Sequence, residues 1–251
     1  MRVLILGGTT EASALARRLA DDTRFEATLS LAGRTAQPAP QALPTRIGGF
    51  GGIDGLVRHL RDEKIVAVID ATHPYADQMS AHAVAACGQA AVPLASLVRA
   101  PWTRQAGDDW IQAVDTRAAA NAIGRNPRRV FLAIGRQELP VFADAPHHHY
   151  LARVIDAPAG DALPPNLTLV QARGPFDLAA ETRLLREHLI DVVVSKNAGG
   201  EATYAKIAAA RTLHLPVVMI ARPHKPIGHA VASPEETVAW LDHVRRSLRG
   251  V

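Results

Sequence analysis

The 251-residue sequence has a single cysteine, Cys87, and no apolar run that approaches the roughly 20 residues needed to cross a bilayer. One cysteine excludes an internal disulfide framework. Because Cys87 lies in a helical pattern, we interpret it as a buried structural thiol and not as a redox group. The first apolar strand begins at Arg2, which leaves no room for a secretory leader. We therefore expect a cytoplasmic protein without a membrane segment.

Aromatic residues are also scarce, at 4% of the chain, and only four of the 28 basic residues are lysines. The net charge is +4 at pH 7, but the arginines are scattered and form no basic run. Surfaces that bind nucleic acid usually combine a basic stripe with aromatic side chains that stack on bases. A positive net charge alone does not choose between nucleic acid, an anionic membrane and a polyanionic small molecule, but the scattered arginines and scarce aromatic residues argue against nucleic acid.

Short aliphatic runs alternate with helical patterns, which is typical of parallel sheets covered by helices on both faces. We predict an α/β fold of two doubly wound, Rossmann-like parallel-sheet domains: an NADP-binding domain over residues 1–110 and a second domain over residues 111–251. Since such sheets bind ligands at the carboxyl ends of their strands, we expect a substrate cleft between the two domains. The expected strands are 2–6, 25–31, 45–47, 65–70, 93–98, 129–134, 148–155, 167–171, 190–195 and 216–220, and the expected helices are 10–21, 52–62, 76–91, 116–124, 177–188, 201–213 and 234–248.

The first predicted strand runs directly into Gly7-Gly8-Thr9-Thr10-Glu11-Ala12. Glycines at such a point let the backbone approach a pyrophosphate, and the helix that follows offers unpaired N–H groups and the positive end of its dipole. Gly8, Thr9, Thr10 and Glu11 are therefore candidate cofactor-binding residues. The spacing is not that of G-x-G-x-x-G, so a tight turn capped by threonine is the structural alternative.

Two further segments point to the same cofactor. Arg34 follows the second predicted strand, where an arginine pairs with the 2′-phosphate of NADP and an acidic residue would accept the 2′-hydroxyl of NAD. The glycines of 48–52, among them Gly49 and Gly51, would allow a ligand to lie close to the backbone. We predict NADPH as the cofactor, with a solvated arginine and a flexible loop as the alternatives.

Polar residues follow another predicted strand, in Asp70-Ala71-Thr72-His73-Pro74-Tyr75-Ala76. The carboxyl end of a parallel strand is where α/β sites lie. We therefore predict that Thr72 contacts the cofactor and that His73 and Tyr75 are candidate proton donors. A lone histidine is often a hydrogen-bonded structural residue, which is the alternative here.

Two strands of the second half end in the same way, in Gly135-Arg136 and in Ser195-Lys196-Asn197-Ala198-Gly199-Gly200. Lys196 could hold a carboxylate or stabilise an electron-rich carbonyl, so we predict that it is catalytic. The alternative is a turn cap whose stem packs on Tyr204. The predicted substrate-binding residues are Arg136, Ser195, Asn197 and Gly199.

A run of three histidines, His147-His148-His149, suggests a metal site at first sight. Successive side chains of a strand point to opposite faces, so the three cannot converge on one ion. No cysteine or carboxylate neighbour completes a ligand set. We therefore predict no metal.

Together, the motifs at 7–12, 70–76 and 195–200, with Gly135-Arg136, resemble the precorrin-6A reductases of cobalamin biosynthesis over nearly the whole chain. The resemblance implies NADPH-dependent reduction of the C18=C19 double bond of the macrocycle precorrin-6A, giving precorrin-6B. It places Thr9, Thr10 and Glu11 at the phosphates and the first helix, Arg34 at the 2′-phosphate, and Tyr75 or Lys196 near the reacting ring.

The implied partner is a polycarboxylate tetrapyrrole, which agrees with the independent indication of an arginine-rich site. The resemblance also raises transfer of the product to the next enzyme of the pathway, and either a cobalt-free or a cobalt-containing substrate fits the sequence. Two other hypotheses stay open. One is a different NADP-dependent reductase, although Tyr75 and Tyr204 lack the Tyr-x-x-x-Lys spacing of short-chain dehydrogenases. The other is a non-catalytic NADP-sensing or tetrapyrrole-carrier module.

Overall fold

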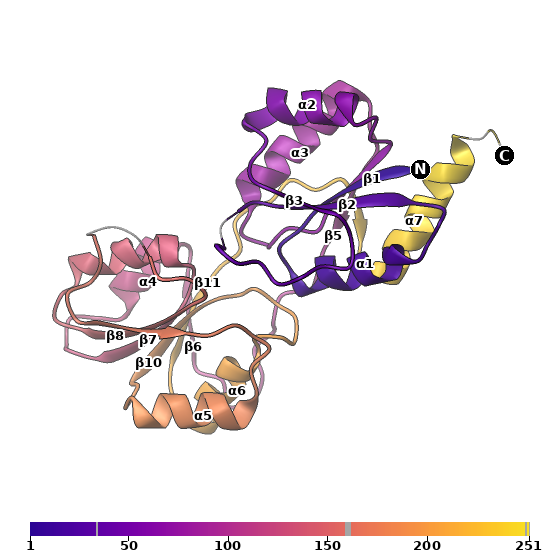
Figure 1. The fold of residues 1–251 in the computed structure, drawn as a ribbon. Coiled ribbons are helices and arrows are strands. Elements are labelled where there is room, and N and C mark those ends of the chain that lie inside the picture. The colour runs from indigo at the N-terminus through magenta and orange to yellow at the C-terminus, as the bar shows by residue number, and fades with distance from the viewer. Residues whose placement is uncertain (34, 159–161, 249, 251) are drawn as a thin grey trace. The chain divides into compact units, whose positions relative to one another are not determined.

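A computed structural model describes residues 1–33, 35–158, 162–248 and 250. The chain forms two compact units, unit 1 from Met1–Ala100 and Pro223–Val251, and unit 2 from Pro101–Arg222. Each unit contains a six-stranded parallel sheet with helices on both of its faces (Figure 1). The predicted α/β class, two doubly wound parallel-sheet domains, is confirmed.

Unit 1 is built around β1 (Arg2–Leu6), whose residues Val3 to Leu6 are almost completely buried. The sheet runs in the order β3-β2-β1-β4-β5-β12, and helices α1 and α7 cover one face while α2 and α3 cover the other (Figure 1). Cys87 lies in α3, on the face that packs against the sheet, and burial raises the pKa of its thiol to about 12. The expected burial of Cys87 is therefore confirmed. The other elements are β2 (Glu26–Leu31), β3 (Thr45–Ile47), β4 (Ala67–Asp70), β5 (Leu94–Leu97), β12 (His229–Val231), α1 (Thr10–Ala20), α2 (Gly52–Asp62), α3 (Asp77–Ala90) and α7 (Pro234–Ser247).

Unit 2 repeats the arrangement around β7 (Arg129–Ala133) and β10 (Val192–Lys196). Its sheet order is β9-β8-β7-β10-β11-β6. Helices α5 and α6 lie on one face and α4 on the other (Figure 1), and α4 packs beside a 3-10 helix, η1. The remaining bounds are β6 (Trp110–Ala113), β8 (His149–Val154), β9 (Leu167–Gln171), β11 (Val217–Ile220), α4 (Thr116–Ala122), η1 (Arg136–Asp144), α5 (Leu178–Glu187) and α6 (Ala205–Thr212).

The strand order corrects the expected domain boundaries. Both sheets follow the 3-2-1-4-5-6 order of dinucleotide-binding folds, but the sixth position is taken by β12 in unit 1 and by β6 in unit 2. β6 comes directly after β5 in the sequence, yet it pairs with β11; β12 comes after β11, yet it pairs with β5. The C-terminal segment expected in a domain over 111–251 therefore belongs to unit 1, and unit 2 begins at Pro101 instead of residue 111.

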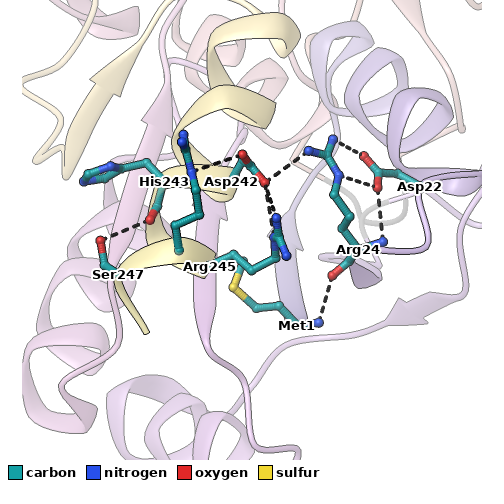
Figure 2. Close-up of polar contacts among 8 residues, drawn as sticks. Met1, Asp22, Arg24, Asp242, His243, Arg245 and Ser247 are labelled. Atoms are coloured by element: carbon teal, nitrogen blue, oxygen red, sulfur yellow. Dashed lines mark hydrogen bonds and ion pairs between the residues drawn. The ribbon is translucent and has the colours of Figure 1, made fainter. Parts of the chain in front are cut away.

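Ion pairs link the last helix, α7, to the segment that follows α1. Asp242 of α7 accepts from the Arg24 guanidinium at 3.1 Å, and Arg24 also pairs with Asp22 at 2.6 Å (Figure 2). The hydrogen bond from Arg24 lowers the pKa of Asp22, and the one from Arg245 lowers the pKa of Asp242. Such surface pairs contribute little individually. Buried side chains of α1 and α7 also belong to the same apolar cluster, so the two helices pack together through apolar contacts as well.

The topology also indicates where ligands bind. In open parallel sheets the strand order reverses at one point, and the crevice there, at the carboxyl ends of the strands, is the usual ligand site. The reversal lies between β1 and β4 in unit 1 and between β7 and β10 in unit 2. Among the helices that the structure describes, none is long and apolar enough to span a bilayer.

At the opposite end of the second sheet, the three consecutive histidines alternate in exposure. His147 and His149 are exposed, whereas His148 is fully buried. The Nδ1 atom of His148 accepts the Arg128 amide at 3.2 Å, and within the described residues its Nε2 has no hydrogen-bond partner. Burial lowers the pKa of His148 because the charged imidazole would be poorly solvated.

This burial predicts an acid-sensitive contribution to stability. A folded-state pKa below the unfolded value of about 6.5 means that His148 costs nothing above that pH and destabilises the fold increasingly as the pH falls through the folded value. We expect the urea midpoint to drop between pH 7.5 and pH 5.5, and His148→Asn, which keeps an acceptor for Arg128, to drop less. His149→Asn is the matched exposed control. Equal pH dependence in all three proteins would contradict the account.

Candidate functional site

The turn between β1 and α1 forms the centre of the unit 1 site. The Gly7 amide donates to the Ser30 carbonyl at 2.9 Å, and a Cβ on Gly7 would lie 2.6 Å from Leu29 Cδ1, so glycine allows this close packing. Gly8 adopts φ +117°, a region that L side chains rarely enter, and no atom lies within 4 Å of where its Cβ would be. The backbone at Gly8 is therefore open to a ligand.

The Thr9 hydroxyl is used by the protein itself. It accepts from the Ala12 amide at 3.1 Å as the N-cap of α1 and donates to the Ala71 carbonyl at 2.9 Å. The structural alternative, a threonine-capped turn, thus describes this side chain. The same bonds join the loop after β1 to the loop after β4. The N–H groups of Thr10 and Glu11, in the first turn of α1, have no carbonyl acceptor within the helix and remain suited to an anion.

Glu11 would by itself repel a phosphate at this helix end. Its Oε2 atom lies 2.7 Å from Arg99 Nη1 and also accepts from the Thr10 hydroxyl at 3.1 Å. Both members of the Glu11–Arg99 pair are mostly buried, so Arg99 offsets the carboxylate. Glu11 therefore lies at the start of α1 as one half of an ion pair with Arg99. The sequence analysis did not single out Arg99.

The glycine loop that leads into α2 is shaped by Arg46. Its guanidinium donates to the Gly49 carbonyl at 2.6 Å and stacks 4.0 Å from the centroid of the Phe50 ring. Gly51 has φ +79°, which the turn into α2 requires. Gly49 has no such requirement, and a Cβ there would meet no atom within 4 Å. Neither conformation nor packing requires a glycine at 49, and the expected contact between Gly49 and the cofactor stays a prediction.

The end of β4 carries a buried polar network. Asp70, 1% exposed, accepts from the Thr72 amide at 3.0 Å, the Thr72 hydroxyl at 2.6 Å and the Ser80 hydroxyl of α3. Lys225 reaches it from the C-terminal segment, with Nζ 3.4 Å from the carboxylate and 3.0 Å from the Thr72 hydroxyl. The Thr72 side chain is thus committed to this network, and its expected cofactor contact stays a prediction.

The predicted proton donors His73 and Tyr75 flank Pro74 in the next turn. Their rings lie 5.6 Å apart and both are half-buried, and the Nδ1 atom of His73 accepts the Tyr75 amide at 3.3 Å. The Asp70 network holds the start of this turn, and the Ala76 amide closes it on the His73 carbonyl at 2.8 Å. Arg34, predicted at the 2′-phosphate, lies outside the described residues.

In unit 2, the predicted residues gather where the strand order reverses. Lys196, at the end of β10, forms an ion pair with Glu138 at 2.7 Å. Arg136, which follows β7, donates to the Ala157 carbonyl at 3.2 Å and lies 3.9 Å from Asp156. Both cations retain exposed surface at this edge.

The other predicted substrate-binding residues form the framework of the loop at 195–200. Ser195 is fully buried and donates to the Lys196 carbonyl, and Gly199 is buried with φ +68°. The amide of Asn197 accepts from the Trp102 N–H at 2.7 Å and donates to the Trp102 carbonyl at 3.0 Å. The expected contacts of these residues with the substrate stay predictions. The side chains of Ser195 and Asn197 shape the loop that presents Lys196.

Four residues of these sites were not singled out from the sequence: Arg46, Arg99, Glu138 and Lys225. Lys225 carried a usable signal, because it is one of only four lysines, as is Lys196. Glu138 stands three residues after Gly135, the spacing of a capping box. No group of three His, Cys, Asp or Glu side chains that could hold a metal occurs in the described parts of the chain.

The Asp70 network predicts a large stability effect. Lys225→Met should destabilise unit 1 by about 3 kcal/mol, because removing one partner leaves a buried carboxylate uncompensated. Adding Asp70→Asn to that variant should recover much of the loss. Lys64→Met, at an exposed lysine, is the control for urea unfolding. A Lys225→Met midpoint equal to that of Lys64→Met would show that the pair contributes nothing.

Comparison with known proteins places this geometry in a family. Residues 2–242 match the family model described as precorrin-6x reductase CbiJ/CobK. A relative from Rhodobacter capsulatus named precorrin-6A reductase is 54% identical over 100% of this chain and 99% of its own. A Salmonella typhimurium relative named cobalt-precorrin-6A reductase is 30% identical over 88% of this chain and 87% of its own.

A solved structure titled CobK precorrin-6A reductase superposes with a TM-score of 0.93 at 54% identity, covering 97% of each chain. The match therefore includes both six-stranded sheets and every motif on which the resemblance was based. The chain belongs to the precorrin-6x reductase CbiJ/CobK family.

Proposed function

We propose that this protein reduces the C18=C19 double bond of precorrin-6A to give precorrin-6B, with NADPH as the reductant. The observation that carries the proposal is the relation over the full length to a protein named precorrin-6A reductase. The proposed substrate is free of cobalt, because identity is much higher to the relative named for precorrin-6A than to the one named for cobalt-precorrin-6A. Transfer of the product to a following enzyme stays a prediction.

The residues at the carboxyl edge of unit 1 fit a dinucleotide. The open backbone at Gly8, the first turn of α1 and the loop through Gly49 and Gly51 would hold its phosphates. Thr9 acts by holding the loops after β1 and β4 together. When bound, the nicotinamide supplies the hydride that this reduction requires.

The preference for NADPH over NADH rests on Arg34, one residue after Gly33 and three after the end of β2. Dinucleotide folds recognise the adenosine ribose at this place, and a guanidinium there pairs with a 2′-phosphate. A charge-assisted contact of this kind contributes about 1.5–3 kcal/mol, which is about tenfold or more in affinity.

Reduction of a carbon–carbon double bond also needs a proton and stabilisation of the charge that develops on the ring. Tyr75 and His73 are placed to hold a proton at the unit 1 edge, in a turn fixed by the Asp70 network. At the unit 2 edge, Lys196 offers an ammonium group and Arg136 a guanidinium. We assign Arg136 to a substrate carboxylate, since its planar fork matches that group.

The deciding experiment incubates the protein with precorrin-6A and NADPH and follows both absorbance spectra. We expect the NADPH signal to fall together with the change in the macrocycle spectrum. Calorimetry should show NADPH binding about tenfold or more tightly than NADH, and Arg34→Ala should remove most of that preference.

Arg17→Ala, at an exposed arginine on α1, is the control for the loss of one positive charge. Binding of both molecules without a spectral change would favour a sensor or carrier. Equal affinities for the two cofactors in the parent protein would contradict the assignment of Arg34.

A further inference from the structure

The second sheet presents a charged pair at the point where its strand order reverses. Lys196 is the last residue of β10, and Glu138 lies in the first turn of η1, directly after β7. Because β7 and β10 are neighbours in the sheet, the pair bridges the crevice between them, with Nζ 2.7 Å from Oε2. At the corresponding point of the first sheet, the loop after β1 contains Gly7 and Gly8, and the charged residues there, Glu11 and Asp70, pair with Arg99 and Lys225. In unit 2, by contrast, the two members of the pair lie at the carboxyl ends of the neighbouring strands themselves.

Glu138 is held on both of its carboxylate oxygens. Oε2, which contacts Lys196, also accepts the Gly135 amide at 3.2 Å, and Oε1 accepts the hydroxyl of Thr116 at 3.1 Å. Thr116 is the first residue of α4, so three segments of unit 2 converge on one side chain. A carboxylate held in this way has little rotational freedom and gives the Lys196 ammonium a fixed direction.

Lys196 is constrained from its backbone as well. Its strand pairs with β11 on one side and β7 on the other, and the loop that follows is bonded to Trp102 through Asn197. The Lys196 side chain is 19% exposed and that of Glu138 is 26% exposed, so each side chain keeps part of its surface at this edge. Arg222 adds two bonds to the same loop, at the carbonyls of Asn197 and Ala198.

We propose that Glu138 is a positioning residue for Lys196, and that the pair serves the reacting ring of the substrate and not one of its carboxylates. Glu138 fixes the direction of the Lys196 ammonium, and a preorganised cation stabilises negative charge that develops at one defined position of the ring as it is reduced. The carboxylates of the substrate are better matched by the planar fork of Arg136. This assignment rests on the function proposed above.

The test is a double-mutant cycle measured by single-turnover reduction of precorrin-6A at saturating NADPH. Lys196→Ala should slow the step by roughly 30- to 1,000-fold, and Glu138→Gln by about tenfold, while the dissociation constants of precorrin-6A and NADPH change by less than about threefold. In the Lys196→Ala background, Glu138→Gln should have almost no further effect, because its action passes through the lysine.

Two further variants keep the outcome clear. Thr116→Val removes one support of Glu138 and should slow the step in the parent protein but not in Lys196→Ala. Glu187→Gln, an exposed glutamate on α5, is the matched control and should behave as the parent. Additive effects in the cycle, or a loss seen mainly in precorrin-6A affinity, would overturn the proposal. A parent protein that does not reduce precorrin-6A at all would overturn the proposed function with it.

Discussion

In a parallel sheet, all strands deliver their carboxyl ends to one edge, and the sites in both units depend on this constraint. Strand β1 brings Gly8 to that edge beside the end of β4, and β7 brings Glu138 beside Lys196. Hydrogen bonds then fix each pair of loops, through Thr9 and Ala71 in unit 1 and through the charged pair in unit 2. The same topology thus yields an open backbone in one unit and an oriented ammonium group in the other.

The two chain connections between the units are anchored at residues next to these sites. Arg99 and Lys225 lie just inside unit 1 and bind Glu11 and Asp70, respectively. Trp102 and Arg222 lie just inside unit 2, and both bind the loop that follows Lys196. Each of the two connections therefore has, on both of its sides, a residue that is bonded to a site segment of its own unit.

The sequence predicts the regular elements well where apolar runs are long and buried. The centres of β1, β4, β7, β10 and β11 are apolar on both faces, so their positions and the fold class follow from the pattern alone. β6 and β12 have only four and three residues, and partners far away in the sequence hold them in place. That long-range pairing is why the domain boundary at residue 110 was wrong.

The site was predictable to the level of segments, but less so for individual side chains. The positions of the motifs in the sequence indicated the candidate loops that contain Gly8, Thr72 and Lys196. Which side chains in those loops can contact a ligand depends on their hydrogen bonds within the protein, and the motifs do not report these bonds. Asn197 and Thr9 are polar residues in the right loops, yet their polar atoms bond to the protein. Glu138 and Lys225 act through contacts with distant residues, and no local pattern reports such contacts.

Amide hydrogen exchange with and without saturating NADPH tests most directly whether the dinucleotide binds at the carboxyl edge of the first sheet. We expect exchange to slow at residues 7–11, 48–52 and 71–76, with little change at 135–138 and 195–200. Slowing confined to the latter two segments would place the cofactor on the second sheet and contradict the assignment.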